Sequence, residues 1–107
     1  MESNDTRGAP RYHFIVDINL TDLKSRIKIE TRTKNLSVSG CGLDALELFP
    51  RGTKVRIELS HADNHMVTDA RIVYSSPTSG MGVIFIGVEP TDKQIIDGWI
   101  IELTSLI

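Results

Sequence analysis

The feature that most restricts the fold of this 107-residue chain is its hydrophobic periodicity. Between His13 and Val88, apolar side chains recur at every second position in short runs, and turn-forming residues separate the runs. A period of two is typical of β-strands with one buried face. Six short runs without helical spacing between them predict a mainly β protein, built as a six-stranded antiparallel barrel or a sandwich.

The predicted strands cover residues 13–20, 25–36, 41–48, 55–59, 66–74 and 81–88, with turns at 21–22, 50–53, 61–65 and 75–80. A helix is predicted to follow, because five apolar residues recur at helical spacing, namely Ile95, Ile96, Trp99, Ile100 and Leu103. Thr91 or Asp92 is expected to cap its N-terminus. Gly98 lowers the helix propensity by about 1 kcal/mol relative to alanine, so Trp99 is expected to stabilise the helix by docking on the barrel.

The composition fits one small globular domain, with 40% hydrophobic and 24% charged residues. The formal net charge of −2 argues against general nucleic-acid binding, which favours basic domains. Cys41 is the one cysteine, so no internal disulfide can form, and it is expected to be a small buried residue. No apolar run is long enough to span a membrane, and the polar N-terminus does not resemble a signal peptide, so a cytoplasmic location is expected.

The predicted second strand has a basic face. Its cations occupy even positions, namely Lys24, Arg26, Lys28, Arg32 and Lys34. Its apolar and threonine residues occupy odd positions, namely Ile27, Ile29, Thr31 and Thr33. Such alternation is common on a solvated strand face. Because this face ends at Asn35, however, Arg32 and Lys34 are also weaker candidates for contacts to a ligand phosphate. Strict alternation places Asn35 on the opposite face from Lys34, so a bulge or the end of regular pairing must intervene if both serve one site.

Two short stretches carry the functional signal. The segment 35–40, NLSVSG, combines an amide at Asn35, a hydroxyl at Ser37 and bare backbone at Gly40, as expected of a sharp polar corner between strands. Arg7 and Arg11 lie four residues apart in the N-terminal segment. A guanidinium can clamp phosphate or pair with the O6 and N7 atoms of guanine. Together these groups suit a guanine nucleotide with several phosphate charges.

Other chemistries have weaker support. The serines lack the G-x-S-x-G context of a hydrolase nucleophile, so no enzymatic activity is expected. His61, His65 and Asp63 are too few ligands, on a turn, to favour a metal site. An oligonucleotide-binding barrel would need several aromatic residues for base stacking, and only 6% of the residues are aromatic. The glycines at 40 and 42 resemble a dinucleotide motif, but no helix is predicted to follow them.

The two stretches, taken together, resemble the binding motifs of the PilZ domain family, small bacterial barrels that bind cyclic di-GMP. The family's R-x-x-x-R motif matches Arg7 and Arg11 within RGAPR, and its [D/N]-x-S-x-x-G motif matches Asn35, Ser37 and Gly40. Similarity extends over the segments 39–43, 51–55 and 81–85. The paired motifs within this strand pattern are much more specific than either alone.

The resemblance implies a six-stranded barrel with one C-terminal helix, formed by residues 9–107, after a flexible tail of residues 1–8. It also implies that Arg7 and Arg11 grip guanine edges and phosphates, that Asn35 contacts a base and that Ser37 holds the phosphate side, while Gly40 shapes the corner. We expect the N-terminal segment to order over the nucleotide and to present a new surface to a downstream protein. No cofactor is implied besides this ligand.

One alternative remains open, in which the barrel is a protein–protein interaction scaffold with a silent nucleotide site. A homodimer is also compatible with the sequence, through the apolar C-terminal residues Leu103, Leu106 and Ile107. Insertion into a membrane is not expected. The process that such a receptor would regulate is not encoded in any motif of the chain.

Overall fold

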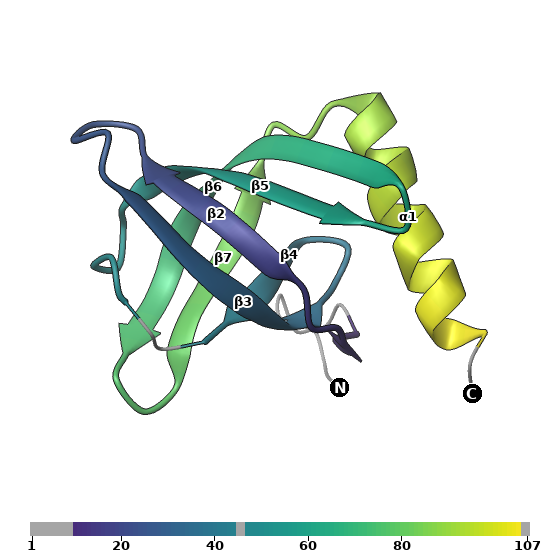
Figure 1. Ribbon diagram of the computed structural model, residues 1–107, viewed down its shortest axis with the longest axis horizontal. Helices are drawn as coiled ribbons and strands as arrows, with labels where there is room; N and C mark the ends of the chain where they lie inside the picture. Colours follow the sequence, from purple (N-terminus) through teal and green to yellow (C-terminus); the bar gives the residue numbers. More distant parts are fainter. Residues whose placement is uncertain (1–9, 45–46, 106–107) are drawn as a thin grey trace, which may run out of the picture.

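The computed structural model describes residues 10–44 and 47–105 (Figure 1). Its strands are β1 (Tyr12–His13), β2 (Asp17–Asp22), β3 (Lys28–Leu36), β4 (Gly40–Leu43), β5 (Lys54–His61), β6 (Asn64–Ser76) and β7 (Gly80–Ile86), and one helix follows, α1 (Pro90–Thr104). All pairings are antiparallel, in the order β1-β3-β2-β5-β6-β7-β4, and a β3–β4 pairing closes the sheet. The predicted six-stranded barrel is therefore confirmed, with β1 as an additional short strand.

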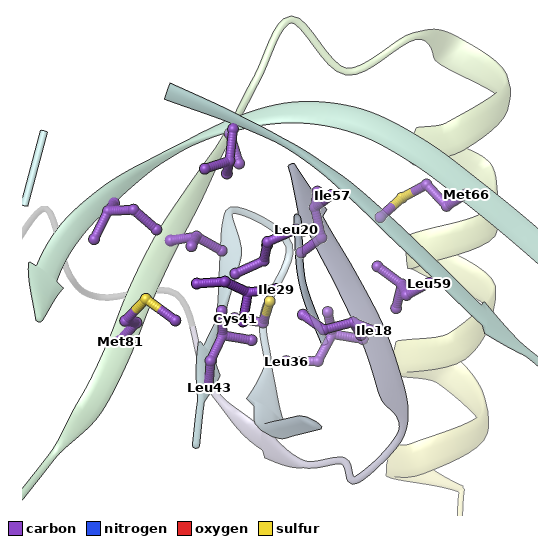
Figure 2. Packing of buried hydrophobic residues seen from close by; sticks show 14 of the residues in the cluster. Ile18, Leu20, Ile29, Leu36, Cys41, Leu43, Ile57, Leu59, Met66 and Met81 are labelled. Atoms are coloured by element: carbon purple, nitrogen blue, oxygen red, sulfur yellow. The ribbon is translucent and has the colours of Figure 1, made fainter. Parts of the chain in front are cut away.

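The barrel interior contains the inward-facing residues of every long strand. Figure 2 shows Ile18 and Leu20 from β2, Leu36 from β3 and Cys41 from β4 converging on one another. In β3, Ile29, Thr31 and Thr33 are buried while the charged residues between them are exposed, which confirms the alternation predicted for that part of the strand. Its predicted start at Ser25 was wrong, because the chain turns at residues 23–27 before β3 begins.

The first predicted strand is interrupted. Residues 14–16 leave the ladder between β1 and β2, because the Phe14 side chain turns into the core. The Thr33 hydroxyl replaces the missing ladder bonds, donating to the Phe14 carbonyl at 2.6 Å and accepting the Val16 N–H at 3.0 Å. The predicted turn at residues 21–22 was also wrong. β2 includes Asp22, whose carboxylate accepts the Lys24 N–H at 2.9 Å and starts the turn there.

The helix α1 lies beside the β5–β6 hairpin (Figure 1). Trp99 is 2% exposed and its indole N–H donates to the His61 carbonyl at 3.1 Å, so its predicted docking on the barrel is confirmed. The predicted capping by Thr91 or Asp92 was wrong. Glu89 occupies the N-cap without a side-chain hydrogen bond, and Pro90, which needs no N–H partner at the first helical position, starts the helix.

The third and sixth predicted strands end earlier than expected, at Leu43 and Ile86. Phe49, beyond the third strand, is buried without belonging to the sheet, so the apolar residues near it pack on the core from an irregular segment. The expected division into a tail of residues 1–8 and a domain of residues 9–107 stays a prediction, since residues 1–9 lie outside the described part.

Candidate functional site

The turn between β3 and β4 forms a rigid polar corner. Ser37 donates its N–H to the Gly40 carbonyl at 2.8 Å, and its hydroxyl accepts the Ser39 N–H at 3.2 Å. The Ser37 hydroxyl also lies 3.3 Å from the Gly40 carbonyl and 3.2 Å from the Ser39 hydroxyl. Since Ser37 is 2% exposed, its side chain satisfies polar groups within the turn itself. The corner therefore keeps its shape through local hydrogen bonds.

Gly40 is needed at this corner because β7 approaches very closely. A Cβ atom at position 40 would lie 1.9 Å from the Val83 carbonyl oxygen and 3.0 Å from the Ile84 Cα. The adjacent Ser39 carbonyl accepts the Phe85 N–H at 2.8 Å, which fixes β7 against the turn. Gly40 thus shapes the corner by admitting a neighbouring strand.

Asn35 lies next to an irregularity in β3. Thr33 pairs with Leu43 and Asn35 with Gly42, so Lys34 is an extra residue on the β3 side. The register is therefore irregular between Thr33 and Asn35, as the sequence requires if Lys34 and Asn35 are to serve one site. The Asn35 Oδ1 atom accepts the Gly42 N–H at 2.9 Å and the Arg11 Nη1–H at 2.8 Å. The structure thus joins one arginine of the first motif directly to the first residue of the second.

The other predicted site residues are distributed around this contact. Arg32 forms an ion pair with Asp44, with 3.3 Å between Nη2 and Oδ2, and Lys34 donates from Nζ to the Ser79 carbonyl at 2.6 Å. Both cations lie on the strand that carries Asn35, yet each has a protein partner. Arg7 lies outside the described residues.

A pocket of about 320 Å³ opens beside Asn35. Its lining combines basic, acidic and apolar residues from three segments, namely His13, Ile15, Arg32, Thr33, Lys34 and Asp44. His13 is the residue of β1 that pairs with Asn35. The surface next to Asn35 is therefore concave on the side of the basic strand face.

A second feature of the site was missed in the sequence. Asn35 pairs with Gly42, Gly42 with Gly82 and Gly82 with Tyr74, so these four residues form one row across β3, β4, β7 and β6. The Tyr74 ring covers Gly82 so closely that a Cβ atom there would lie 2.0 Å from Tyr74 Cε2. We call Gly42 and Gly82 the glycine shelf. Its signal in the sequence is a pair of glycines two residues apart in each of two strands, Gly40 and Gly42, then Gly80 and Gly82.

Cys41 lies beneath this surface, on the inner side of β4. Burial raises the pKa of its thiol to about 12, although the nearby positive charge of Arg11 acts in the opposite direction. The thiol is neutral at physiological pH and acts as a small core residue, as predicted.

The histidines at the β5–β6 hairpin have other contacts. His61 Nε2 lies 3.0 Å from Glu102 Oε1 of α1, and His65 Nδ1 lies 2.6 Å from the Ser60 hydroxyl. Within residues 10–44 and 47–105, no group of three or more histidine, cysteine or acidic side chains has the arrangement of a metal site. In the same described ranges, no helix has the length and apolarity needed to cross a lipid bilayer.

Comparisons with solved structures show the same fold at low sequence identity. The PilZ domain of YcgR from Escherichia coli, solved with c-di-GMP, is 19% identical with a TM-score of 0.72, covering 94% of this chain and 93% of that one. The PilZ domain of CeSA from a cellulose-synthesizing bacterium is 15% identical with a TM-score of 0.69, covering 92% and 98%. The motility inhibitor MotI/DgrA of Bacillus subtilis is 18% identical with a TM-score of 0.71, and the match covers 95% of this chain but 53% of that one.

No curated protein matches the chain by sequence. The family model of the PilZ domain, however, matches residues 5–102, a range that includes both arginines of the first motif and the whole β3–β4 corner. Together with the closed barrel and its C-terminal helix, this match shows that the chain belongs to the PilZ domain family.

Proposed function

We propose that this chain is a receptor domain for cyclic di-GMP, which binds over the β3–β4 corner without undergoing a reaction. The observation that carries the proposal is the contact between Arg11 and Asn35, which brings the two motifs to one place. The PilZ domain of YcgR was solved with this nucleotide, and the fold of that domain is the same.

The groups around the corner match the chemistry of the ligand. Arg11 is exposed beside Asn35 and offers several N–H donors in one plane, which suits guanine O6 and N7 or a phosphate oxygen. The glycine shelf is covered by the Asn35 amide and the Tyr74 ring, so a flat base would meet these two side chains, of which the Tyr74 ring is 37% exposed. Base–aromatic stacking contributes about 1 to 3 kcal/mol per base where it forms.

The proposed site includes five further residues with different roles, namely Arg7, Ser37, Gly40, Arg32 and Lys34. Arg7 closes over the nucleotide from the N-terminal segment, and the two strand cations serve phosphates once they release their protein partners. Ser37 and Gly40 act by keeping the corner in shape, because the Ser37 hydroxyl is already bonded within the turn. The ordering of the N-terminal segment then creates the surface that a downstream protein reads, at an entropic cost taken from the binding energy.

Isothermal titration calorimetry with cyclic di-GMP tests the proposal, with GTP as the competing ligand. The variant Arg11→Ala is expected to bind about ten- to a hundredfold more weakly, as loss of hydrogen bonds to a charged group costs about 1.5 to 3 kcal/mol. Arg51→Ala, an exposed arginine in the turn before β5, is the matched control and is expected to bind as the wild type does.

Two outcomes oppose the proposal. Near-native affinity of Arg11→Ala would remove Arg11 from the site. No binding of cyclic di-GMP to the wild-type protein would instead favour the interaction scaffold with a silent nucleotide site. Three further expectations remain predictions and depend on the outcome of this titration: the cytoplasmic location, the protein partner and a homodimer.

A further inference from the structure

The turn between β2 and β3 carries three cations and one exposed apolar side chain. The cations are Lys24, Arg26 and Lys28, and Ile27, which lies between two of them in the chain, is 59% exposed. The turn projects from the barrel on the side away from α1 (Figure 1). A single exposed aliphatic residue is ordinary on a protein surface. Its position among exposed cations is what distinguishes this turn.

The turn before β5 adds further positive charge beside it. The Leu23 N–H donates to the Lys54 carbonyl at 3.1 Å, so the two turns are joined. A pocket of about 450 Å³ opens between them, lined by Asp22, Leu23, Lys24, Gly52, Thr53 and Lys54. Lys54 also lies directly opposite Arg71 of β6, and both are exposed. Like charges in such a pair repel, and a bound anion relieves the repulsion.

Positive charge without a protein partner is concentrated at this place. Arg32, Arg56 and Lys93 form ion pairs, and Arg11 and Lys34 donate hydrogen bonds. Within residues 10–44 and 47–105, the lysines and arginines without a side-chain hydrogen bond or ion pair are Lys24, Arg26, Lys28, Arg51, Lys54 and Arg71. All of them belong to the two turns or to the strand position opposite Lys54, in a chain whose net charge is −2.

The backbone of the β2–β3 turn has a fixed shape. The Asp22 carbonyl accepts the Arg26 N–H at 2.8 Å, and the Asp22 carboxylate accepts the Lys24 N–H at 2.9 Å. The hydrogen bond from the Lys24 N–H lowers the pKa of the Asp22 carboxyl, whose charge is thus directed to the backbone. Arg26 has a φ of 68°, in the left-handed region that favours glycine. A cation therefore occupies a position for which the turn itself favours a residue without a side chain.

We propose that this surface is a docking site for an anionic lipid membrane, with its cations at the level of the headgroup phosphates and Ile27 in the upper part of the acyl chains. We call it the basic tip, defined as Lys24, Arg26, Ile27, Lys28 and Lys54. The attachment is peripheral, because a turn rests on the lipid surface and no element crosses it. β3 runs from Lys28 at the basic tip to Asn35 at the corner, about 23 Å at 3.3 Å per residue, so lipid and nucleotide can bind at once.

The composition of the basic tip favours a lipid surface over other anions. Cations around an apolar side chain are typical of segments that lie in the membrane interface. Each lysine or arginine near an anionic surface contributes about fivefold to binding, and transfer of Ile27 out of water adds to it. A single-stranded nucleic acid would favour aromatic side chains for base stacking, and the basic tip contains none. A free phosphate would make no use of Ile27.

Sedimentation with lipid vesicles tests the proposal, using the full chain without nucleotide. The vesicles consist of phosphatidylcholine alone, or of equal parts of phosphatidylcholine and phosphatidylglycerol. Binding to the anionic vesicles is expected to be at least about tenfold stronger than to the neutral ones. It should weaken as the salt concentration rises, because salt screens exposed charges. Equal binding to both vesicles, or no binding to either, would overturn the proposal.

Two pairs of variants locate the surface. Lys24→Gln combined with Lys54→Gln is expected to weaken binding to anionic vesicles by about twentyfold, whereas Lys93→Gln in α1 should change it by less than about twofold. Ile27→Ser should weaken binding by about three- to tenfold. Its matched control is Ile101→Ser, because Ile101 is 67% exposed on α1, and binding should not change. Equal losses in the basic tip and in α1 would show that the basic tip is not the docking site.

Arg26→Gly separates lipid binding from folding. Glycine adopts a positive φ readily, so the melting temperature should be at least as high as that of the wild type. Binding to anionic vesicles should nevertheless fall by about fivefold, because one cation is lost. Unchanged vesicle binding would remove Arg26 from the basic tip, and a lower melting temperature would attribute the loss to the fold instead.

Competition distinguishes the lipid from other anionic partners. A short single-stranded oligonucleotide and poly-glutamate are added to the vesicle assay at constant salt. Neither is expected to release the protein at a charge concentration equal to that of the lipid. Release by either one would assign the basic tip to a nucleic acid or to an acidic protein and overturn the proposal. The Lys24→Gln and Lys54→Gln double variant should bind cyclic di-GMP as the wild type does, so failure of the proposed function leaves the vesicle result unaffected.

Discussion

Two neighbouring regions at one end of this small barrel are held together by different forces. Where α1 packs on the β5–β6 hairpin, the rings of Phe14 and Trp99 lie 5.7 Å apart and His61 contacts both, so apolar burial fixes the helix against the hairpin. At the β3–β4 corner, hydrogen bonds accepted by the side chains of Asn35 and Ser37 fix the backbone instead. The comparison predicts that the first region serves mainly stability and that the second serves the proposed recognition of the ligand.

The N-terminal segment connects the two regions. Phe14 is buried in the core beside Trp99, while Arg11, three residues earlier, contacts Asn35 at the corner. The apolar contact at α1 therefore anchors the segment that carries Arg11, the arginine proposed to bind the ligand. Changes at the α1 contact should lower stability strongly, and changes at the corner should lower it less while affecting binding more.

The largest loss of stability is expected for Trp99→Ala. Removing a fully buried aromatic side chain costs about 3 to 5 kcal/mol, through lost burial and the cavity left behind. Urea unfolding measures it, with Ile101→Ala on the exposed face of α1 as the control, expected within about 0.5 kcal/mol of the wild type. A loss below about 1 kcal/mol for Trp99→Ala would contradict the anchoring role of the contact between α1 and the β5–β6 hairpin.

Gly40→Ala is expected to cost less, about 1 to 3 kcal/mol, because β7 must move away from the new Cβ atom. Gly98→Ala, which adds the same methyl group in an open helix position, should instead stabilise the protein by about 0.5 to 1 kcal/mol. Thermal unfolding of the two variants compares them directly. Equal melting temperatures would show that the close approach of β7 does not constrain residue 40.

Ser37→Ala is expected to cost about 1 to 2 kcal/mol, since it removes a buried hydroxyl that accepts the Ser39 N–H and contacts the Gly40 carbonyl. Ser60→Ala, an exposed hydroxyl that contacts His65, serves as the control and should change stability by less than about 0.5 kcal/mol. The comparison predicts that Ser37→Ala also weakens cyclic di-GMP binding. Wild-type stability in this variant would mean that the corner does not depend on its side-chain hydrogen bonds.

The last prediction concerns Cys41, whose ionisation affects stability only at high pH. Its pKa of about 12 lies above the usual value of 9.0, so the fold favours the neutral thiol. This contribution to stability is fully present below pH 9.0 and is lost as the pH rises toward about 12. At pH 8, a thiol reagent should react only as urea unfolds the protein. Rapid modification of the native protein would show that the inner face of β4 is accessible.

The barrel was predictable because alternation in β2, β3, β5 and β6 reflects one buried face per strand. The failures have local physical causes. Phe14 leaves the ladder to reach Trp99, a contact more than 80 residues away along the chain, and periodicity cannot detect such a contact. Glu89 occupies the N-cap in place of a better capping residue, because Pro90 already fixes the first turn of α1.

The site was predictable where it depends on local sequence. The residues 35–40 indicate a polar corner, and the irregularity between Thr33 and Asn35 is the departure from strict alternation that a shared site of Lys34 and Asn35 would require. Gly42 and Tyr74 were missed because their roles arise from pairing between strands: one makes room for the Asn35 amide and the other covers Gly82. Only the register of the closed barrel brings these residues into one row.

Chemical-shift mapping by ¹H–¹⁵N NMR during titration with cyclic di-GMP tests the central claim most directly. The account predicts that the largest shifts occur in the backbone amides of residues 35–42, at Gly82 and at the Arg11 side chain. The Trp99 indole N–H, which donates to the His61 carbonyl inside the α1 contact, should stay nearly unchanged. Shifts concentrated around α1, or no shifts at all, would contradict the assignment of recognition to the β3–β4 corner.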